Sequence, residues 1–246
     1  MTRRRPLFEE CDVCARLYVQ PIEPLEPGLP SGGEALARFF TRDGDAVDLR
    51  RILGLAKLTG RQIDVDSWAL EGVASLLRAN SQRPDFLSVN VTATTLLNQE
   101  YSQHLQEVCA APEIASRLWL EVTESERLAP VGRVLDLIGT LRQAGVRLAL
   151  DDLGAGHMSL AVLRDIDADV IKIDGALIKG LARSQRAQMI VKTIVDLAHR
   201  LGAHIVAEWI ETTEDLAAAK ELGADFGQGY LFGRPTPADR PFICQT

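Results

Sequence analysis

The strongest constraint on the fold is an alternation of short apolar runs with segments of helical periodicity along most of the chain. Between residues 148 and 174, an apolar run ends in Asp151 and Asp152, and a glycine-rich turn and a short helical pattern follow it. A second apolar run then occupies residues 170–173 and contains Lys172. Strands that alternate with helices form a mostly parallel sheet with helical crossovers. The chain is therefore predicted to be an α/β protein.

Eight strands are predicted, with helices between nearly all of them. The strands cover residues 15–22, 33–39, 86–91, 118–122, 147–150, 170–173, 204–207 and 226–232. The helices cover residues 47–57, 64–78, 95–109, 131–144, a short stretch from 159, 186–201 and 213–222. The link between the first two strands is too rich in proline and glycine to form a helix, so those strands should be antiparallel. We expect a TIM-like (β/α)8 barrel with an antiparallel first strand, and an open doubly wound sheet is the alternative.

Length and composition indicate one ordinary globular domain. The 246 residues match the usual size of such a barrel, so we expect an irregular leader over 1–14 and a barrel domain over 15–246. No apolar run approaches the ~20 residues that cross a membrane, and no signal-peptide core follows the basic start. Only Cys11 and Cys14 form a C-x-x-C pair, so four free thiols and a cytoplasmic location are expected. The net charge of −7 argues against a DNA or RNA polymer as partner.

Amide or ionised side chains lie near one end of every predicted strand from the second to the eighth. In chain order they are Glu34 and Arg38, Asn90, Glu121 and Glu124, Asp151 and Asp152, Lys172, Glu208, and Gln228. Catalytic residues of a barrel come from strand ends, so these side chains should converge. Clustered carboxylates repel one another, and a pair of divalent cations would relieve that repulsion and activate a water. The residues alone leave open a phosphate-ester hydrolase or an enolase-like proton abstraction with a lysine base.

Ordered motifs at these positions narrow the choice. They are YVQPI at 18–22, EAL at 34–36, SVN at 88–90, EVTES at 121–125, DDLGAG at 151–156, KID at 172–174, AEWIET at 207–212 and QGYLF at 228–232. Over residues 16–237 the sequence resembles the EAL-domain family, bacterial phosphodiesterases that hydrolyse cyclic di-GMP. The resemblance implies opening of cyclic di-GMP to linear pGpG by in-line attack of a metal-activated water.

The resemblance also implies two divalent cations, Mg2+ or Mn2+. Four side chains would hold the first cation, namely Glu34, Asn90, Glu121 and Asp151. Asp151 would bridge to the second cation, which Asp152 would also hold. Glu208 would assist the second cation or the attacking water, and Lys172 would orient or deprotonate that water. The site is thus expected to be both acidic and metal-dependent.

Further positions match the substrate groove and a loop of the family. The groove positions are Gln20, Leu36, Arg38 and Gln228. Arg38 suits a phosphate oxygen, and Gln228 can hydrogen-bond ribose, base or phosphate. Glu124 resembles the carboxylate that steadies the loop after the fifth strand. Cyclic di-GMP is therefore the expected ligand.

The chain departs from the family pattern beside the acidic residues. Leu153 stands where an aromatic is usual, His157-Met158 where Tyr-Ser is usual, and Trp209 where a glycine is usual. Trp209 is expected either to crowd the site or to point into the barrel–helix interface without a catalytic role. These departures keep open a weakly active or inactive cyclic di-GMP receptor or adaptor.

Other expectations concern histidines and partners. His157 reads as a surface or hinge residue, and His104, His199 and His204 have no evident partner or role. The resemblance implies a homodimer through helices that flank the loop after the fifth strand. Because no separate sensory domain is recognised, regulation is expected to come from another protein.

Overall fold

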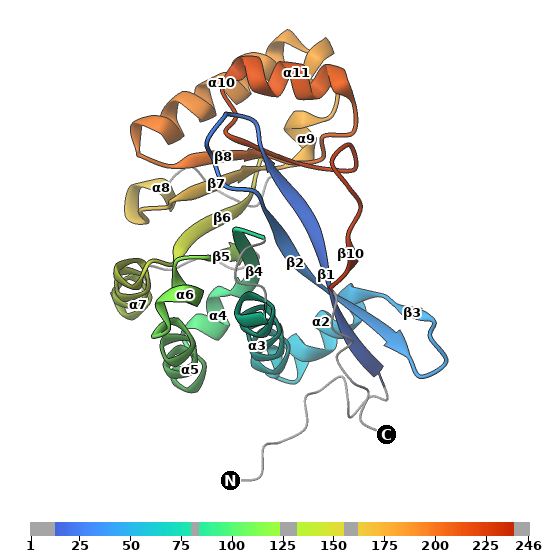
Figure 1. The fold of residues 1–246 in the computed structure, drawn as a ribbon, viewed down its shortest axis with the longest axis vertical. Helices are drawn as coiled ribbons and strands as arrows, with labels where there is room; N and C mark the ends of the chain where they lie inside the picture. The colour runs from blue at the N-terminus through green and yellow to red at the C-terminus, as the bar shows by residue number, and fades with distance from the viewer. Residues whose placement is uncertain (1–12, 80–83, 124–131, 155–161, 239–246) are drawn as a thin grey trace.

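Eight strands close into a barrel with helices outside it (Figure 1). This computed structural model describes residues 13–79, 84–123, 132–154 and 162–238. The barrel strands are β1 Val13–Pro24, β2 Gly32–Thr41, β4 Phe86–Thr92, β5 Leu118–Thr123, β6 Arg147–Leu153, β7 Val170–Ile173, β8 His204–Ala207 and β9 Phe226–Gln228. β1 is antiparallel to both neighbours, β2 and β9, and the other barrel pairs are parallel. The predicted (β/α)8 barrel with an antiparallel first strand is confirmed.

Two short strands at the barrel's margin were not predicted. β3 (Ala46–Val47) pairs with β2, and β10 (Thr236–Pro237) pairs with β1. Strands of two residues are too short to show a period. The last barrel strand also ends at Gln228, before the predicted end at residue 232. A Cβ at Gly229 would lie 2.2 Å from the carbonyl oxygen of Ile210, so only glycine allows this close approach of two backbones.

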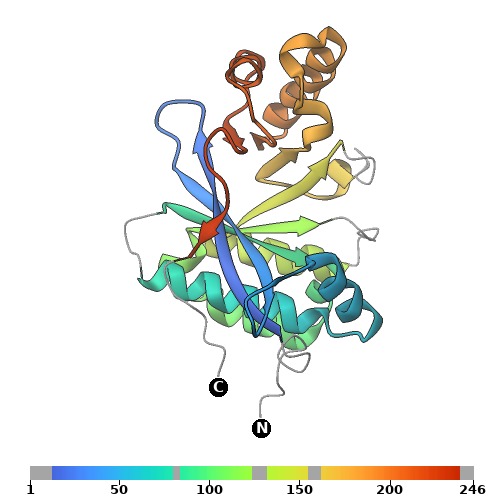
Figure 2. The same cartoon turned by 90° about the vertical axis from the view of Figure 1, so that its right-hand side faces the viewer.

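The helices cover the outside of the barrel. They are α2 Leu49–Leu58, α3 Gln62–Ala79, α4 Ala93–Leu96, α5 Gln99–Cys109, α6 Pro112–Ala115, α7 Gly132–Ala144, α8 Val162–Asp165, α9 Gly175–Ile178, α10 Gln185–Arg200 and α11 Thr213–Leu222. Figures 1 and 2 place α10 and α11 toward one end of the molecule and α3, α5 and α7 toward the other. The single helix predicted over 95–109 is wrong at its start, because Asn98 caps α5 by accepting a hydrogen bond from the N–H of Tyr101.

An apolar layer fills one level of the barrel interior. Its buried members come from seven strands and are Ile22, Phe86, Trp119, Ala149, Val170, Val206 and Phe226. Phe86 stacks on Trp119 with ring centroids 3.6 Å apart, and Phe226 meets both rings edge-on. This apolar layer closes the barrel beneath the polar residues described below, five of which lie two positions further along the same strands.

Two expectations about cysteine and histidine side chains are wrong. Cys14 is disulfide-bonded, whereas Cys109 is free and buried. Cys11 and Cys244 lie outside the described residues. Each of the three histidines within the described residues has an acidic partner. The pairs are His104 with Glu71 at 2.8 Å, and His199 and His204 with Asp225 at 2.9 and 3.1 Å. Among the described residues, no helix has the length and apolar character to cross a membrane.

Candidate active site

A layer of polar side chains lies directly above the apolar layer. Because side chains on one face of a strand recur every two residues, the residue two positions on also points inward. Glu121 thus follows Trp119 on β5, and Lys172 follows Val170 on β7. The remaining members of this polar layer are Glu34, Asn90, Asp151, Glu208 and Gln228. Seven segments far apart in the sequence therefore supply one site.

The ammonium group of Lys172 is the centre of the polar layer. It is 1% exposed and lies between four carboxylates, at 2.7 Å from Glu208, 3.1 Å from Glu121, 3.2 Å from Glu34 and 3.3 Å from Asp151. A lysine buried in a strand is costly unless opposite charges compensate it. Here the compensating charge exceeds what one ammonium can balance, and a net negative cluster remains.

Neutral amides complete the surroundings of Glu34. Asn90 Nδ2 donates to Glu34 Oε1 at 2.8 Å, and Gln228 Nε2 donates to Glu34 Oε2 at 2.7 Å. Gln228 Nε2 also lies 3.4 Å from Gln20 Oε1 on β1. Glu34 is the third residue of β2 and pairs in register with Ser88, so it is positioned near the start of its strand rather than at the end.

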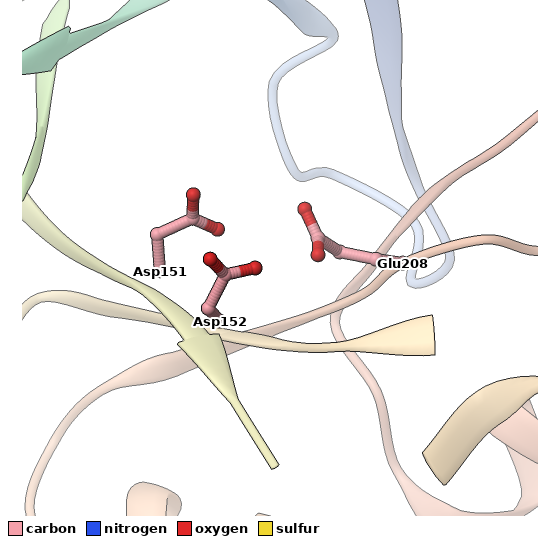
Figure 3. Close-up of side chains that lie close together, drawn as sticks. All are labelled: Asp151, Asp152 and Glu208. Atoms are coloured by element: carbon pink, nitrogen blue, oxygen red, sulfur yellow. The ribbon is translucent and has the colours of Figure 1, made fainter. Parts of the chain in front are cut away.

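A β-bulge brings two adjacent aspartates to the same side. In a regular strand Asp151 and Asp152 would point to opposite faces. The β6–β7 register shifts between Leu150 and Leu153, and Asp152 has a left-handed φ of 61°. Carboxylate oxygens of Asp151, Asp152 and Glu208 consequently all lie within 4.8 Å of one another (Figure 3).

The acidic surroundings shift the pKa values of the site in different directions. Burial raises the pKa of Glu121 well above its ordinary value. Lys172 lowers this pKa, but the negative charges of Glu34 and Asp151 raise it and offset that attraction. Burial likewise raises the pKa of Glu208 to about 8. The pKa of Glu34 is lowered despite its burial, by Lys172 and the two amides, and the carboxylates raise the pKa of Lys172 despite its burial. Lys172 is therefore held as an ammonium donor.

The donor set fits hard divalent cations. Oxygen ligands from clustered carboxylates are what Mg2+ and related ions prefer. The buried oxygen Glu121 Oε1 accepts no hydrogen bond from the described residues, and Asp151 Oδ1 has only its ion pair with Lys172. The Asp151–Asp152–Glu208 group has the spacing of a cation site. Burial, with Asp151 close by, also raises the pKa of Asp152, as expected for a carboxylate that lacks enough positive charge.

A cleft of about 220 Å3 opens beside the polar layer. All four residues predicted for the substrate groove line it, together with two of the buried carboxylates; these are Gln20, Leu36, Arg38 and Gln228 with Glu34 and Glu208. Five further lining residues were not predicted for the groove: Trp209, Glu211, Gly229, Tyr230 and Pro235. All of these except Pro235 belong to the recognised motifs. The motifs therefore contained the right residues, but they did not reveal which side chains point into the cleft.

The departures from the family pattern fall in different environments. Leu153 is 3% exposed and packs in the main core. Trp209 is 52% exposed at the cleft and packs against Gly175, so it lies neither inside the polar layer nor wholly in the barrel–helix interface. Glu124, His157 and Met158 lie outside the described residues.

Comparison with known proteins identifies the family. The EAL domain family matches residues 8–235. The chain is 34% identical over 229 residues to "Cyclic di-GMP phosphodiesterase NbdA" of Pseudomonas aeruginosa, covering 90% of this chain and 29% of that protein. It is 30% identical over 226 residues to "Cyclic di-GMP phosphodiesterase PdeA" of Borreliella burgdorferi, covering 90% of this chain and 33% of that protein. The chain thus spans a third or less of the length of these relatives.

Solved structures agree with this assignment. The PaMucR phosphodiesterase in its c-di-GMP complex is 30% identical, with a TM-score of 0.79 over 94% of both chains. An EAL domain protein from Listeria monocytogenes, at 24% identity, has a TM-score of 0.83 over 93% of this chain and 91% of that one, which supports the fold. By fold and by family match, this chain belongs to the EAL domain family.

Proposed function

We propose that the chain is a divalent-metal-dependent phosphodiesterase that hydrolyses cyclic di-GMP to linear pGpG. The main support is the polar layer itself, in which four buried carboxylates surround Lys172 beside an open cleft. The names of the similar proteins add the substrate. A binding-only protein would gain nothing from burying so many unbalanced carboxylates, because their mutual repulsion destabilises the fold.

Two divalent cations would be held by the acidic residues. Glu34, Asn90, Glu121 and Asp151 would hold the first, and Asp151, Asp152 and Glu208 would hold the second. Bound there, they supply charge neutralisation at the phosphate and a lower pKa for the attacking water. The alternative of an enolase-like base is less favoured, because Lys172 is held as an ammonium by its four carboxylate neighbours.

The chain's own side chains would position the substrate and the water. Arg38, at the cleft wall, would donate to a phosphate oxygen, and Gln20 and Gln228 would hydrogen-bond ribose, base or phosphate. The Lys172 ammonium would orient the water, and Glu208 would accept its hydrogen bond. In-line attack forms one P–O bond to the water oxygen and breaks the bond to the opposite ribose oxygen. The attacking water gives one proton to solvent, and the leaving ribose oxygen takes up one proton from solvent and departs as a hydroxyl.

Turnover of cyclic di-GMP by the purified chain tests this proposal. Chromatography should detect pGpG with Mg2+ or Mn2+ and none with excess EDTA. Glu208→Gln should lower kcat by about 10²-fold, the scale seen when one polar group at a reacting centre is removed. Glu107→Gln, an exposed glutamate on α5, is the matched control and should leave kcat unchanged. Tight binding without turnover under both metals would instead favour the receptor or adaptor.

Further expectations stay proposals. A barrel domain over 15–246, a homodimer, a separate regulatory protein and a cytoplasmic location are all consistent with the family, and none of them is tested by the described residues. Light scattering of the purified chain would measure the oligomeric state. A protein that stays monomeric at every concentration up to and including the one used in the turnover assay would count against the homodimer.

A further inference from the structure

Trp209 presents an exposed indole on the wall of the cleft, directly after Glu208. It is 52% exposed, whereas Trp119 is 2% exposed and Trp68 is half-buried against Phe39. An indole left in solvent forgoes the large gain from burying its apolar surface. A position on the rim of a ligand cleft gives that surface something to contact.

The backbone around Trp209 fixes the direction in which its side chain leaves the main chain. Trp209 has a left-handed φ of 56°, which a bulky residue adopts only when the surroundings impose it. On one side, the N–H of Glu208 donates to the carbonyl oxygen of Ile173 at 3.1 Å. On the other side, the N–H of Ile210 donates to the carbonyl oxygen of Gln228 at 3.0 Å. The strained residue is therefore fixed between two hydrogen-bonded neighbours.

Helix α9 backs one side of the indole. A Cβ at Gly175 would lie 2.4 Å from Cγ of Trp209, so the ring packs where Gly175 has no side chain. Lys179 Nζ lies 4.9 Å from the ring centroid, and its N–H donates to the carbonyl oxygen of Gly175 at 2.8 Å. Because Gly175 and Lys179 are one helical turn apart, they contact the indole from the same element. Trp209 also lines the cleft, so its half-exposed side chain borders that cavity.

A flat, rigid aromatic surface at a nucleotide cleft suits base stacking. Purine bases stack on exposed aromatic rings, and the contact adds affinity without distinguishing one base from another. We propose that Trp209 is the stacking surface for one guanine base of cyclic di-GMP, an inference that rests on the function proposed above. The indole then acts in substrate binding, and it takes no part in the bond-breaking step.

Four variants test the stacking surface. Trp209→Gly removes the ring and suits the left-handed backbone, and Trp209→Phe keeps a smaller aromatic surface. Gly175→Ala displaces the ring without removing it, because the new Cβ would overlap it. Trp68→Phe is the fluorescence control, since Trp68 lies away from the cleft in the cluster around Phe39. Each protein is assayed with Mg2+ for KM and kcat, and in EDTA for the Kd of cyclic di-GMP.

Stacking predicts a binding defect with normal chemistry. Trp209→Gly should raise Kd and KM about tenfold and leave kcat within about twofold, because uniform binding is lost. Trp209→Phe should raise them less than Trp209→Gly does, and Gly175→Ala should also weaken binding. Cyclic di-GMP should quench the tryptophan fluorescence of the parent and of Trp68→Phe, and the quench should vanish in Trp209→Phe. Melting temperatures report whether any loss reflects unfolding.

The outcomes separate this inference from the proposed function. A parent that neither binds nor hydrolyses cyclic di-GMP contradicts both. A parent that is active, with Trp209→Gly equal to it in Kd and KM, overturns the stacking role alone. A Trp209→Gly variant that binds more tightly or turns over faster also overturns it, since the indole would then obstruct the cleft. Fluorescence quenching by cyclic di-GMP that persists in Trp209→Phe would also overturn the stacking role, because another tryptophan would then be its source.

Discussion

Two neighbouring layers of the barrel interior share a backbone and differ completely in chemistry. The apolar layer packs Phe86, Trp119 and Phe226 ring against ring. Two residues further along these strands, the polar layer gathers three carboxylates around Lys172, and Glu34 of β2 adds a fourth. Both layers are buried, and both are reached by the same two-residue period. Strand geometry therefore decides only which positions face inward.

The difference indicates which layer serves the fold. Apolar side chains gain free energy when they leave water, whereas buried charges lose hydration that their partners only partly replace. We expect the apolar layer to supply stability and the polar layer to cost some. Changes in the free energy of unfolding, measured in EDTA by denaturant titration, give a common scale for the following comparisons.

Truncation in the apolar layer should have the largest effect on stability. Trp119→Ala removes a 2% exposed ring that stacks on Phe86, and it should lower the free energy of unfolding by about 3–5 kcal/mol. The loss should be equal with and without Mg2+, because Trp119 has no atom suited to ligating a hard cation and is not among the proposed ligands. A loss below about 1 kcal/mol would show that the apolar layer is not the structural base of the barrel.

Asp225 tests ordinary ion pairing on the far side of the apolar layer, with an intermediate effect. Despite its burial, the pKa of Asp225 is lowered by hydrogen bonds from His204, the N–H of Ile205 and His199. A lowered folded pKa adds stability above the unfolded value of about 3.9, and that stability is lost as the pH falls through the folded value. Asp225→Asn should therefore lower the free energy of unfolding by about 1–2 kcal/mol at pH 7.

The pH series supplies the control for Asp225→Asn. The difference between parent and variant should shrink as the pH falls below about 4. Asp196→Asn makes the same change at an exposed i,i+4 pair with Lys192, where solvent screens the charges and the effect should be much smaller than at Asp225. An Asp225→Asn cost that is constant from pH 7 to pH 3 would mean that packing, and not charge, is involved.

The sequence predicted the polar layer better than its arrangement. Lys172 and Glu121 stand out because a charged residue inside an apolar strand is rare. The family resemblance predicted the other residues that surround them. The position of Lys172 at the centre of four carboxylates depends on the register between neighbouring strands, which no local sequence pattern encodes. The bulge that turns Asp152 beside Asp151 leaves no mark in composition, and the left-handed Trp209 contradicts residue preference outright. The predicted ends of helices and strands were wrong where a capping residue set the end, as at Asn98 before α5, and the two-residue strands β3 and β10 were missed.

Of the three buried or partly buried positions changed, Trp119, Asp225 and Glu121, Glu121→Gln should have the smallest effect on stability, although Glu121 is as buried as Trp119 two residues before it. Its raised pKa means that the ionised form is disfavoured in the fold, so removing the charge removes a destabilising term at neutral pH. Lys172 keeps three other carboxylates, so no uncompensated ammonium is left. The free energy of unfolding in EDTA should thus change by less than about 1 kcal/mol.

Metal binding then separates Glu121→Gln from a neutral core change. Mg2+ or Mn2+ should raise the melting temperature of the parent, because a ligand that binds only the folded state stabilises it. Glu121→Gln should lose most of that increase and most turnover, since a carboxylate ligand has become a neutral amide, while Trp119→Ala should keep the increase. If Glu121→Gln instead lost several kcal/mol in EDTA and kept its response to metal, the polar layer would be part of the structural core, and the proposed division between the two layers would be wrong.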